Sequence, residues 1–349
     1  MTVLQIRHCG LQFHYHCFAY REGWRMPQVS VLLPVYNGGR LCVRTVDSIL
    51  CQTFEDFELI VVDDGSIDDT RELLKVFAAR DHRIRLVFLE KNGGITRALN
   101  AGLALAQGSY VARTDCGDTS DPDRLRLQIR FLENHPEHIL VGTAAWLTDG
   151  SLRVGAWQPS ALEDAAIRRS LYLRVNPVIH PSVMFRRVEG MMYDPLFEYV
   201  EDHEYWFRMG MLGKFAILPQ LLVEYRLHAG ISWQKRALQM RLASLARLKL
   251  CRMLKGRSLP GEEILRARQK LESSRVEAKR SSRYVLRHAR SRTGGRMKRL
   301  FWKTAAVLFY PRALCKALDM GMHWLYLPLD RCYKKWCRGG DHNQNRFGT

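Results

Sequence analysis

The sequence predicts an open α/β fold, in which helices cover both faces of a mostly parallel sheet. Two runs dominated by Val, Leu and Ile, 29–35 and 59–62, predict buried strands. Strand and helix patterns alternate from residue 29 to residue 140 with short links, as in βαβ units. Parallel strands end at one edge of a sheet, and polar residues follow these strands. We therefore expect a ligand, with a nucleotide as the candidate, to bind at that edge.

Hydrophobic periodicity and turn residues place the elements of residues 29–140 in order. Acids before the second helix suit the positive end of its dipole. Gly108 is expected to close the third helix, and Pro122 to occupy the first position of the fourth. The predicted strands are 29–37, 57–62, 85–89 and 110–113, and the predicted helices are 39–51, 68–79, 95–106 and 121–134.

The charge of the chain is distributed unevenly. The net charge is +19, yet residues 1–232 carry 25 basic and 28 acidic side chains. Residues 233–349 carry 29 basic and 7 acidic side chains, which marks a boundary near residue 232. The pattern of 235–299 predicts basic helices, broken at the glycine pair 294–295.

Three interpretations of this basic extension stay open. Basic helices with Leu, Phe and Trp, as in 299–303, suit an anionic membrane surface. Clustered Lys and Arg also suit nucleic acid, but no recognised nucleic-acid motif accompanies them, which argues against it. The third interpretation is a solvated helical face.

Other classes of protein are excluded by the composition. No apolar run approaches the roughly 18–20 residues of a membrane span. The nine cysteines contain no CxxC pair, which argues against a zinc site or a disulfide scaffold and favours reduced thiols in the cytoplasm. Residues 1–26 lack the apolar core of a secretion signal. They are either an extension upstream of a start at Met26 or a short ordered flap.

Several short motifs occur in one order along residues 34–125. They are Pro34-Val35-Tyr36-Asn37, Val62-Asp63-Asp64-Gly65-Ser66, Asn92-Gly93-Gly94 with Arg97, Asp115-Cys116-Gly117-Asp118, and Pro122-Asp123-Arg124-Leu125. This series resembles family 2 of the inverting glycosyltransferases that use nucleotide sugars, and the resemblance covers about residues 28–230. It implies a GT-A, Rossmann-like α/β fold with a nucleotide-sugar half, 27–140, and an acceptor half, 141–232, before the basic helical extension.

The resemblance implies a donor site at the ends of the first strands. It makes Pro34, Tyr36 and Asn37 part of the base pocket, with Tyr36 stacked on the base. Asp64 would accept a hydrogen bond from the base, most often uracil, and Asp63 would support that turn or the ribose. An arginine fork matches phosphate oxygens, so Arg97 would face the diphosphate. The alternatives are a solvated acidic turn and an ordinary surface arginine.

The acidic motif departs from the family pattern. The family usually has Asp-Ala-Asp-Asp there, and the third residue gives a carboxylate to Mg²⁺ or Mn²⁺. Here that position is Gly117, which has no side chain. The resemblance also makes Asp115 part of the donor site. Three interpretations follow: Asp115 or Asp118 reaches the metal ion instead, cations such as Arg97 replace it, or the chain is an inactive copy. His228 is a further candidate near the diphosphate or metal ion.

The acid pair Glu201-Asp202 resembles the family motif at the start of a helix that faces the acceptor. Inverting transfer needs a carboxylate to take the proton of the acceptor hydroxyl. We expect Asp202 to be this base, with Glu201 second; an acid that serves only the helix dipole is the alternative. His180, between two prolines, resembles part of the acceptor loop, although a lone histidine is often only structural.

These expectations combine into one function. The sequence predicts an inverting glycosyltransferase that moves one sugar from a nucleotide sugar, a UDP-sugar above all, to a glycan or lipid-linked acceptor. The setting implied by the resemblance is bacterial surface polysaccharide synthesis, in the cytoplasm or on the inner face of the plasma membrane. The alternative is an impaired nucleotide-sugar-binding or scaffold protein, because of Gly117.

Overall fold

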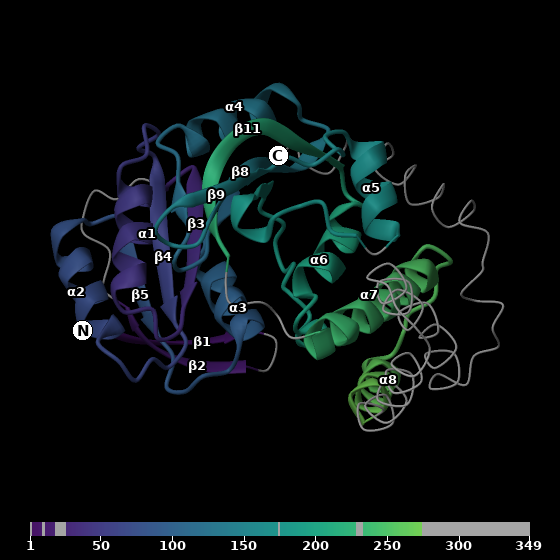
Figure 1. Cartoon of the computed structure of the whole chain (residues 1–349). Helices are drawn as coiled ribbons and strands as arrows, with labels where there is room; N and C mark the ends of the chain where they lie inside the picture. The colour runs from purple at the N-terminus through teal and green to yellow at the C-terminus, as the bar shows by residue number, and fades with distance from the viewer. Residues whose placement is uncertain (1, 9–10, 18–25, 174, 228–232, 274–349) are drawn as a thin grey trace, which may run out of the picture. The chain divides into compact units, whose positions relative to one another are not determined.

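The computed structural model describes residues 2–8, 11–17, 26–173, 175–227 and 233–273. A nine-stranded sheet forms the centre of residues 26–227 (Figure 1), with the strand order β5-β4-β3-β6-β10-β8-β11-β7 and with β9 paired to β8. Its strands are β3 (Val29–Val35), β4 (Phe57–Asp63), β5 (Ile84–Phe88), β6 (Tyr110–Arg113), β7 (Thr119–Ser120), β8 (His138–Thr148), β9 (Arg153–Trp157), β10 (Met184–Arg186) and β11 (Lys214–Arg226).

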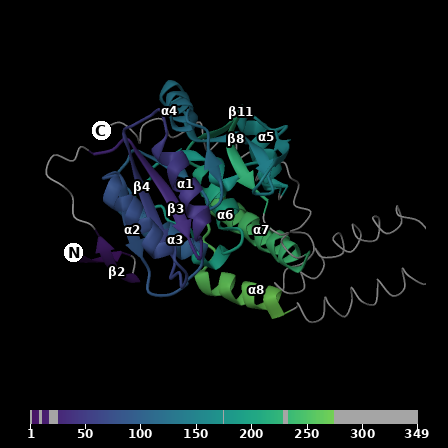
Figure 2. The ribbon, with the colours of Figure 1, turned by 60° about the vertical axis from the view of Figure 1, so that its left-hand side comes forward.

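The strands β5, β4, β3 and β6 are parallel, which confirms the α/β class. Helices connect them along the chain, as the sequence predicts (Figure 2). These helices are α1 (Arg40–Leu50), α2 (Thr70–Arg80) and α3 (Ile95–Leu105), and a fourth helix, α4 (Arg124–Asn134), lies between β7 and β8 in the chain. Beyond β6 the sheet is mixed, because β10 is antiparallel to both β6 and β8, whereas β8 and β11 are parallel.

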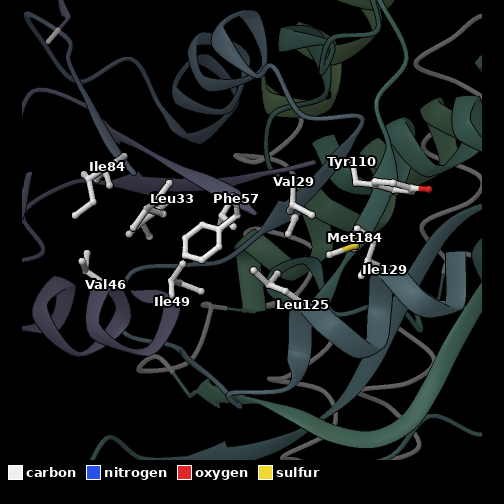
Figure 3. Packing of buried hydrophobic residues seen from close by; sticks show 14 of the residues in the cluster. Val29, Leu33, Val46, Ile49, Phe57, Ile84, Tyr110, Leu125, Ile129 and Met184 are labelled. Carbon is white, nitrogen blue, oxygen red and sulfur yellow. The ribbon is translucent and has the colours of Figure 1, made fainter. Parts of the chain in front are cut away.

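Strand alternation divides the apolar residues between the two faces of the parallel sheet. Val29, Val31 and Leu33 of β3 belong to one buried cluster with Val46 and Ile49 of α1 (Figure 3). The intervening residues face α3. A Cβ built on Gly102 of α3 would lie 3.1 Å from the Leu32 side chain and 3.4 Å from that of Val62. A small residue therefore lets α3 lie close to the strands.

Two sequence predictions about helix ends are corrected. Gly108 does not close α3, which ends at Leu105, and its φ is not positive. Instead, a Cβ there would lie 2.6 Å from the backbone nitrogen of Ser30, so glycine permits a close backbone approach. Helix α4 begins at Arg124, after Pro122 rather than with it.

Two further helices lie in the second half of residues 26–227, namely α5 (Asp164–Tyr172) and α6 (Glu201–Met209). A buried histidine joins them, since the Nε2 atom of His203 lies 2.9 Å from the carbonyl oxygen of Leu171. Two short 3₁₀ helices, His180–Ser182 and Pro195–Phe197, lie between α5 and α6 in the chain. Most residues of α6 are buried, so packing on all sides holds the helix and its first turn in place.

The remaining described residues form separate elements. Strands β1 (Thr2–His8) and β2 (Leu11–Cys17) pair as an antiparallel hairpin in the segment for which the sequence leaves two interpretations. Beyond residue 230, α7 (Trp233–Met253) and α8 (Gly261–Ser273) belong to a second unit and are joined by a hydrogen bond from Arg241 to the carbonyl oxygen of Leu271. The glycine pair 294–295 and the segment 299–303 lie outside the described residues. No described helix has the length and apolarity that a bilayer crossing needs.

Candidate active site

The carboxyl ends of three parallel strands bring the predicted donor residues to one edge of the sheet. Tyr36 and Asn37 follow β3, Asp64 follows β4, and Asp115 follows β6, while β3 is hydrogen-bonded to both of the other strands. Pro34 is the penultimate residue of β3 and is half-buried. This edge is therefore the place where a ligand can meet all three loops.

The loops after β3 and β4 are tied together by Asn37. Its backbone N–H donates to the Ser66 hydroxyl at 2.8 Å, and its side-chain oxygen accepts from the N–H of Ile67 at 3.0 Å. Asn37 has a φ of +48°, a conformation that asparagine tolerates better than most residues. The Tyr36 ring, 47% exposed, is left on the surface beside this junction, as a stacking residue requires.

Asp63 and Asp64 have different surroundings. Asp63 is fully buried and accepts a hydrogen bond of 2.6 Å from Arg71 Nε, while Arg71 also donates to the carbonyl oxygen of Leu89. The backbone N–H of Ser66 lies 3.2 Å from the Asp63 carboxylate. Asp63 thus supports the turn, which is one of the two roles that the resemblance implies.

Asp64 connects the β4 loop to the start of α3. Its carboxylate accepts the backbone N–H groups of Gly93 and Gly94 at 2.9 and 2.8 Å. Burial raises the pKa of Asp64 above its ordinary value, against these hydrogen bonds and the charge of Arg97. Arg97 itself is half-buried and donates to the carbonyl oxygen of Lys91 at 3.0 Å. Asp64 and Arg97 therefore lie in one connected loop structure.

The acidic motif after β6 contains an ion pair that the sequence analysis did not predict. Buried Arg113, the last residue of β6, contacts both carboxylate oxygens of Asp115, one of them at 2.6 Å. Asp118 is fully buried, and its Oδ1 accepts the backbone N–H of Arg226 at 2.7 Å. Burial, with the negative charge of Asp115, raises the pKa of Asp118 to about 8.

The predicted acid pair lies in the first turn of α6. Glu201 is buried, and its carboxylate oxygen Oε2 has no hydrogen-bond partner in the part of the chain that the structure describes. Half-buried Asp202 accepts from the side-chain nitrogen of Asn176 and from the N–H of His203, both at 2.7 Å. Burial, with the charge of Asp202, raises the pKa of Glu201 to about 8, and burial raises that of Asp202 to about 6. Both carboxyl groups therefore hold their protons to higher pH than ordinary acids, and the lower pKa of Asp202 suits it better to act as a base at pH 7.

His180 lies beside this acid pair. Its Nδ1 is 4.0 Å from the nearer Glu201 oxygen, and its Nε2 is 3.0 Å from the Tyr193 hydroxyl. Burial, with the charge of Arg113, lowers the pKa of His180, so its imidazole is neutral at pH 7. Its ring also meets the buried Trp206 edge to face. His228 lies outside the described residues.

Arg113 links the ends of the parallel strands to α6 electrostatically. Its charge lowers the pKa values of both Glu201 and Asp202, and the charge of Asp115 raises that of Glu201. The loop of Asp64 reaches the same region, because a Cβ on Gly94 would lie 2.3 Å from a Glu198 carboxylate oxygen, shortly before α6. The sequence signal for this link between the strand ends and α6 is an arginine, Arg113, at the end of a buried strand.

Comparison with known sequences decides the family. A model of glycosyl transferase family 2 matches residues 30–188. TuaG of Bacillus subtilis, a glycosyltransferase named for teichuronic acid biosynthesis, is 33% identical over 208 residues, which are 58% of this chain and 80% of that protein. The chain belongs to glycosyl transferase family 2. The resemblance seen in the motifs, and with it the enzyme class, is confirmed at this level.

One further relative and one solved structure extend the comparison. A glycosyltransferase of Haemophilus influenzae is 29% identical over 215 residues, which are 58% of this chain and 66% of that protein. The match thus spans just under two thirds of that relative's length. The crystal structure of S. aureus TarS 1–349 in complex with UDP-GlcNAc has a TM-score of 0.55 and 16% identity, with 90% of each chain covered. At this identity the likeness shows the fold alone, and it confirms the GT-A type of α/β sheet.

The acidic motif offers fewer free carboxylate ligands than the family pattern provides for a divalent metal ion. Position 117 has no side chain, Asp115 is paired with Arg113, and Asp118 accepts a backbone N–H with Oδ1, while its buried Oδ2 has no hydrogen-bond partner among the described residues. Within the described ranges, which leave out His228, no group of three or more His, Cys, Asp or Glu side chains could hold a metal ion. Mg²⁺ or Mn²⁺ thus stays a prediction that the titrations below test.

Proposed function

We propose that this chain is an inverting glycosyltransferase that moves one sugar from a UDP-sugar to a glycan or lipid-linked acceptor during synthesis of a surface polysaccharide. One observation carries the proposal: the acid pair Glu201–Asp202 is coupled electrostatically, through Arg113, to Asp115 at the strand ends. This coupling supports a single site that contains the proton acceptor and the predicted donor-binding loops.

The donor would lie along the sheet edge. The exposed Tyr36 ring stacks on the base, while the Asp64 carboxylate accepts from the base edge in addition to Gly93 and Gly94. Arg97 turns its guanidinium to the diphosphate. The crystal structures of TarS in complex with UDP and with UDP-GlcNAc support a uridine nucleotide as the donor.

The chemical step is a direct displacement at the anomeric carbon. The acceptor oxygen forms a bond to that carbon while the bond to the diphosphate oxygen breaks, and the configuration inverts. The acceptor proton moves to the Asp202 carboxylate, and the nucleoside diphosphate leaves with the bond electrons. A pKa of about 6 leaves Asp202 ionised at pH 7 but close enough to act as a base. Holding both reactants at one site supplies a large part of the rate.

The position of His180 supports the acceptor side of the proposal, and the name of one relative supports the class of product. His180 borders Glu201 and so lies where an acceptor hydroxyl would approach the pair. The name of TuaG supports a cell-wall or surface polysaccharide as the product class. Domain boundaries at 26/27 and 232/233 remain proposals.

The basic extension would hold the enzyme at the inner face of the plasma membrane, where a lipid-linked acceptor is available. This hypothesis rests on the 29 basic against 7 acidic residues of 233–349. In a flotation assay, the purified chain should bind anionic vesicles at low salt and leave them at high salt. Equal binding to neutral vesicles would contradict it.

The test of the function is an assay of nucleoside diphosphate release from a panel of UDP-, GDP- and dTDP-sugars, with and without Mn²⁺ and with glycan acceptors. Turnover of one donor, lost in Asp202→Asn while donor binding persists, supports a transferase. Binding of a donor without turnover for any acceptor would instead favour the impaired binding or scaffold protein that Gly117 suggests.

A further inference from the structure

The family's usual metal-ligand position is covered by an arginine from a distant strand. Gly117 has a φ of +100°, and a Cβ built on it would lie 3.4 Å from Cδ and 3.8 Å from Nη1 of Arg226. An L-residue such as aspartate would be strained in this backbone conformation. The Arg226 side chain thus packs directly on the position where relatives with the usual motif carry a carboxylate.

A second glycine makes room on another side of the same guanidinium. Gly150, in the turn between β8 and β9, has a φ of +103°, and a Cβ there would lie 2.9 Å from Nε of Arg226. Its carbonyl oxygen accepts a hydrogen bond of 3.1 Å from Arg44. Gly150 therefore makes room for the Arg226 side chain, and a larger side chain at residue 150 would displace it.

The backbone of Arg226 is fixed to the acidic motif. Its N–H donates to Asp118 Oδ1 at 2.7 Å, although the two residues are 108 apart in the sequence. The pairing of β11 with β7, in which Glu224 is opposite Thr119, brings the two segments together. The sheet thus fixes the backbone of Arg226 beside the acidic motif.

One guanidinium nitrogen has no acceptor. Nη1 of Arg226 is buried, and no hydrogen-bond partner for it occurs in the described part of the chain. The acid on the neighbouring turn, Asp149, accepts the N–H groups of Ser151 and Leu152 with Oδ1, and these bonds, with the charge of Arg226, lower its pKa. A buried donor without a partner is costly, so a bound anion would relieve this cost.

We propose that the Arg226 guanidinium is the resident cation of the donor site and neutralises the diphosphate of the nucleotide sugar where relatives use a carboxylate-held metal ion. This inference rests on the proposed function, because it needs a diphosphate at this edge. A guanidinium can donate two hydrogen bonds to phosphate oxygens, and its charge stabilises the leaving diphosphate. With Arg226 beside Gly117, a cationic side chain then replaces the metal ion, and the missing carboxylate does not mean that the site is inactive.

The test is isothermal titration of the full chain with UDP and with uridine, each in EDTA and in Mn²⁺. GDP with guanosine serves if the base differs. We expect UDP to bind in EDTA with an affinity that Mn²⁺ changes by less than about threefold. Arg226→Ala should weaken UDP about tenfold or more and leave uridine unchanged, because only the diphosphate loses a charged contact. Arg226→Lys, which keeps a cation, should retain more UDP affinity than Arg226→Ala.

The matched control is Arg126→Ala on α4. This variant removes one exposed arginine whose partner is Asp123, and it should leave UDP affinity unchanged. The melting temperature of each variant separates loss of contact from loss of fold. UDP binding that requires Mn²⁺, or that is equal in wild type and Arg226→Ala, overturns the inference and leaves the proposed function standing. If neither nucleotide nor nucleoside binds the wild-type chain, the proposed function fails and takes the inference with it.

Discussion

The guanidinium of Arg113 contacts both carboxylate oxygens of Asp115, two residues further along the chain. This bidentate pair occupies an acid of the motif that the family uses for metal ions. At the same time, the positive charge of Arg113 lowers the pKa values of Glu201 and Asp202 in α6. One buried arginine therefore engages the Asp115 carboxylate and also contributes to how easily the proposed base ionises.

Replacing this arginine should shift the pH dependence of the reaction. In Arg113→Lys the bidentate contact is lost and the positive charge is less well placed, so Asp202 should bind its proton more tightly. The acidic limb of the pH–rate profile should move to higher pH, and unfolding should become easier by about 1–3 kcal/mol. Parallel pH–rate profiles and urea melts measure both effects. An unmoved limb would show that Arg113 does not tune the base.

The wild-type rate should fall in acid. With a pKa of about 6, Asp202 is ionised above that pH and becomes protonated below it, so it can no longer accept the acceptor's proton. The value of kcat/KM should fall about tenfold for each pH unit below pH 6. A rate that stays flat down to pH 4.5, in buffers that leave the fold intact, would exclude Asp202 as the base.

Glu201 should behave differently from its neighbour. Its pKa is raised from 4.5 to about 8 in the fold, so the folded state binds its proton more tightly than the unfolded chain does. Its contribution to stability is therefore complete below pH 4.5 and is lost as the pH rises towards 8. Glu201→Gln removes this loss, and we expect it to be more stable than wild type at pH 9 by on the order of 1–3 kcal/mol.

Thermal melts of Glu201→Gln at pH 5 and pH 9 measure this difference. Because the glutamine resembles the protonated acid, the variant should also keep most of its turnover at pH 7, whereas Asp202→Asn should not. The reverse pattern, with turnover lost in Glu201→Gln and kept in Asp202→Asn, would exchange the two roles.

Tyr36 offers a test of base stacking. Its ring is 47% exposed beside the loop junction, and no hydrogen bond of its hydroxyl group occurs in the described residues. Tyr36→Phe should bind UDP as the wild type does, while Tyr36→Ala should lose about 1–3 kcal/mol of binding free energy, the worth of one stacked base. Titration calorimetry measures both variants. Equal affinity in Tyr36→Ala and Tyr36→Phe would place the base elsewhere.

Local sequence patterns predicted the elements of the first half because each one depends on its own residues. The apolar runs became β3 and β4 within two residues of the predicted ends, and the small-residue helix became α3. Gly108 was misread because its constraint is tertiary: the backbone of Ser30 lies against it. Sequence spacing alone does not reveal such an approach.

The candidate site was predictable only in part, for the same reason. Asp64 and Asp202 were named from motifs, but their partners, Gly93, Gly94 and Asn176, come from other segments. The contact between Gly117 and Arg226 depends on the pairing of β7 with β11. A missing ligand was visible in the sequence, whereas the cation beside it became visible only in the fold.

The most direct test of the account is a comparison of wild type and Asp202→Asn for donor affinity and for nucleoside diphosphate release from the donor that the panel identifies. The account predicts equal donor affinity in the two proteins and a release rate that falls about a hundredfold or more in Asp202→Asn, in the range expected for loss of a general base. Equal release rates in the two proteins would contradict it.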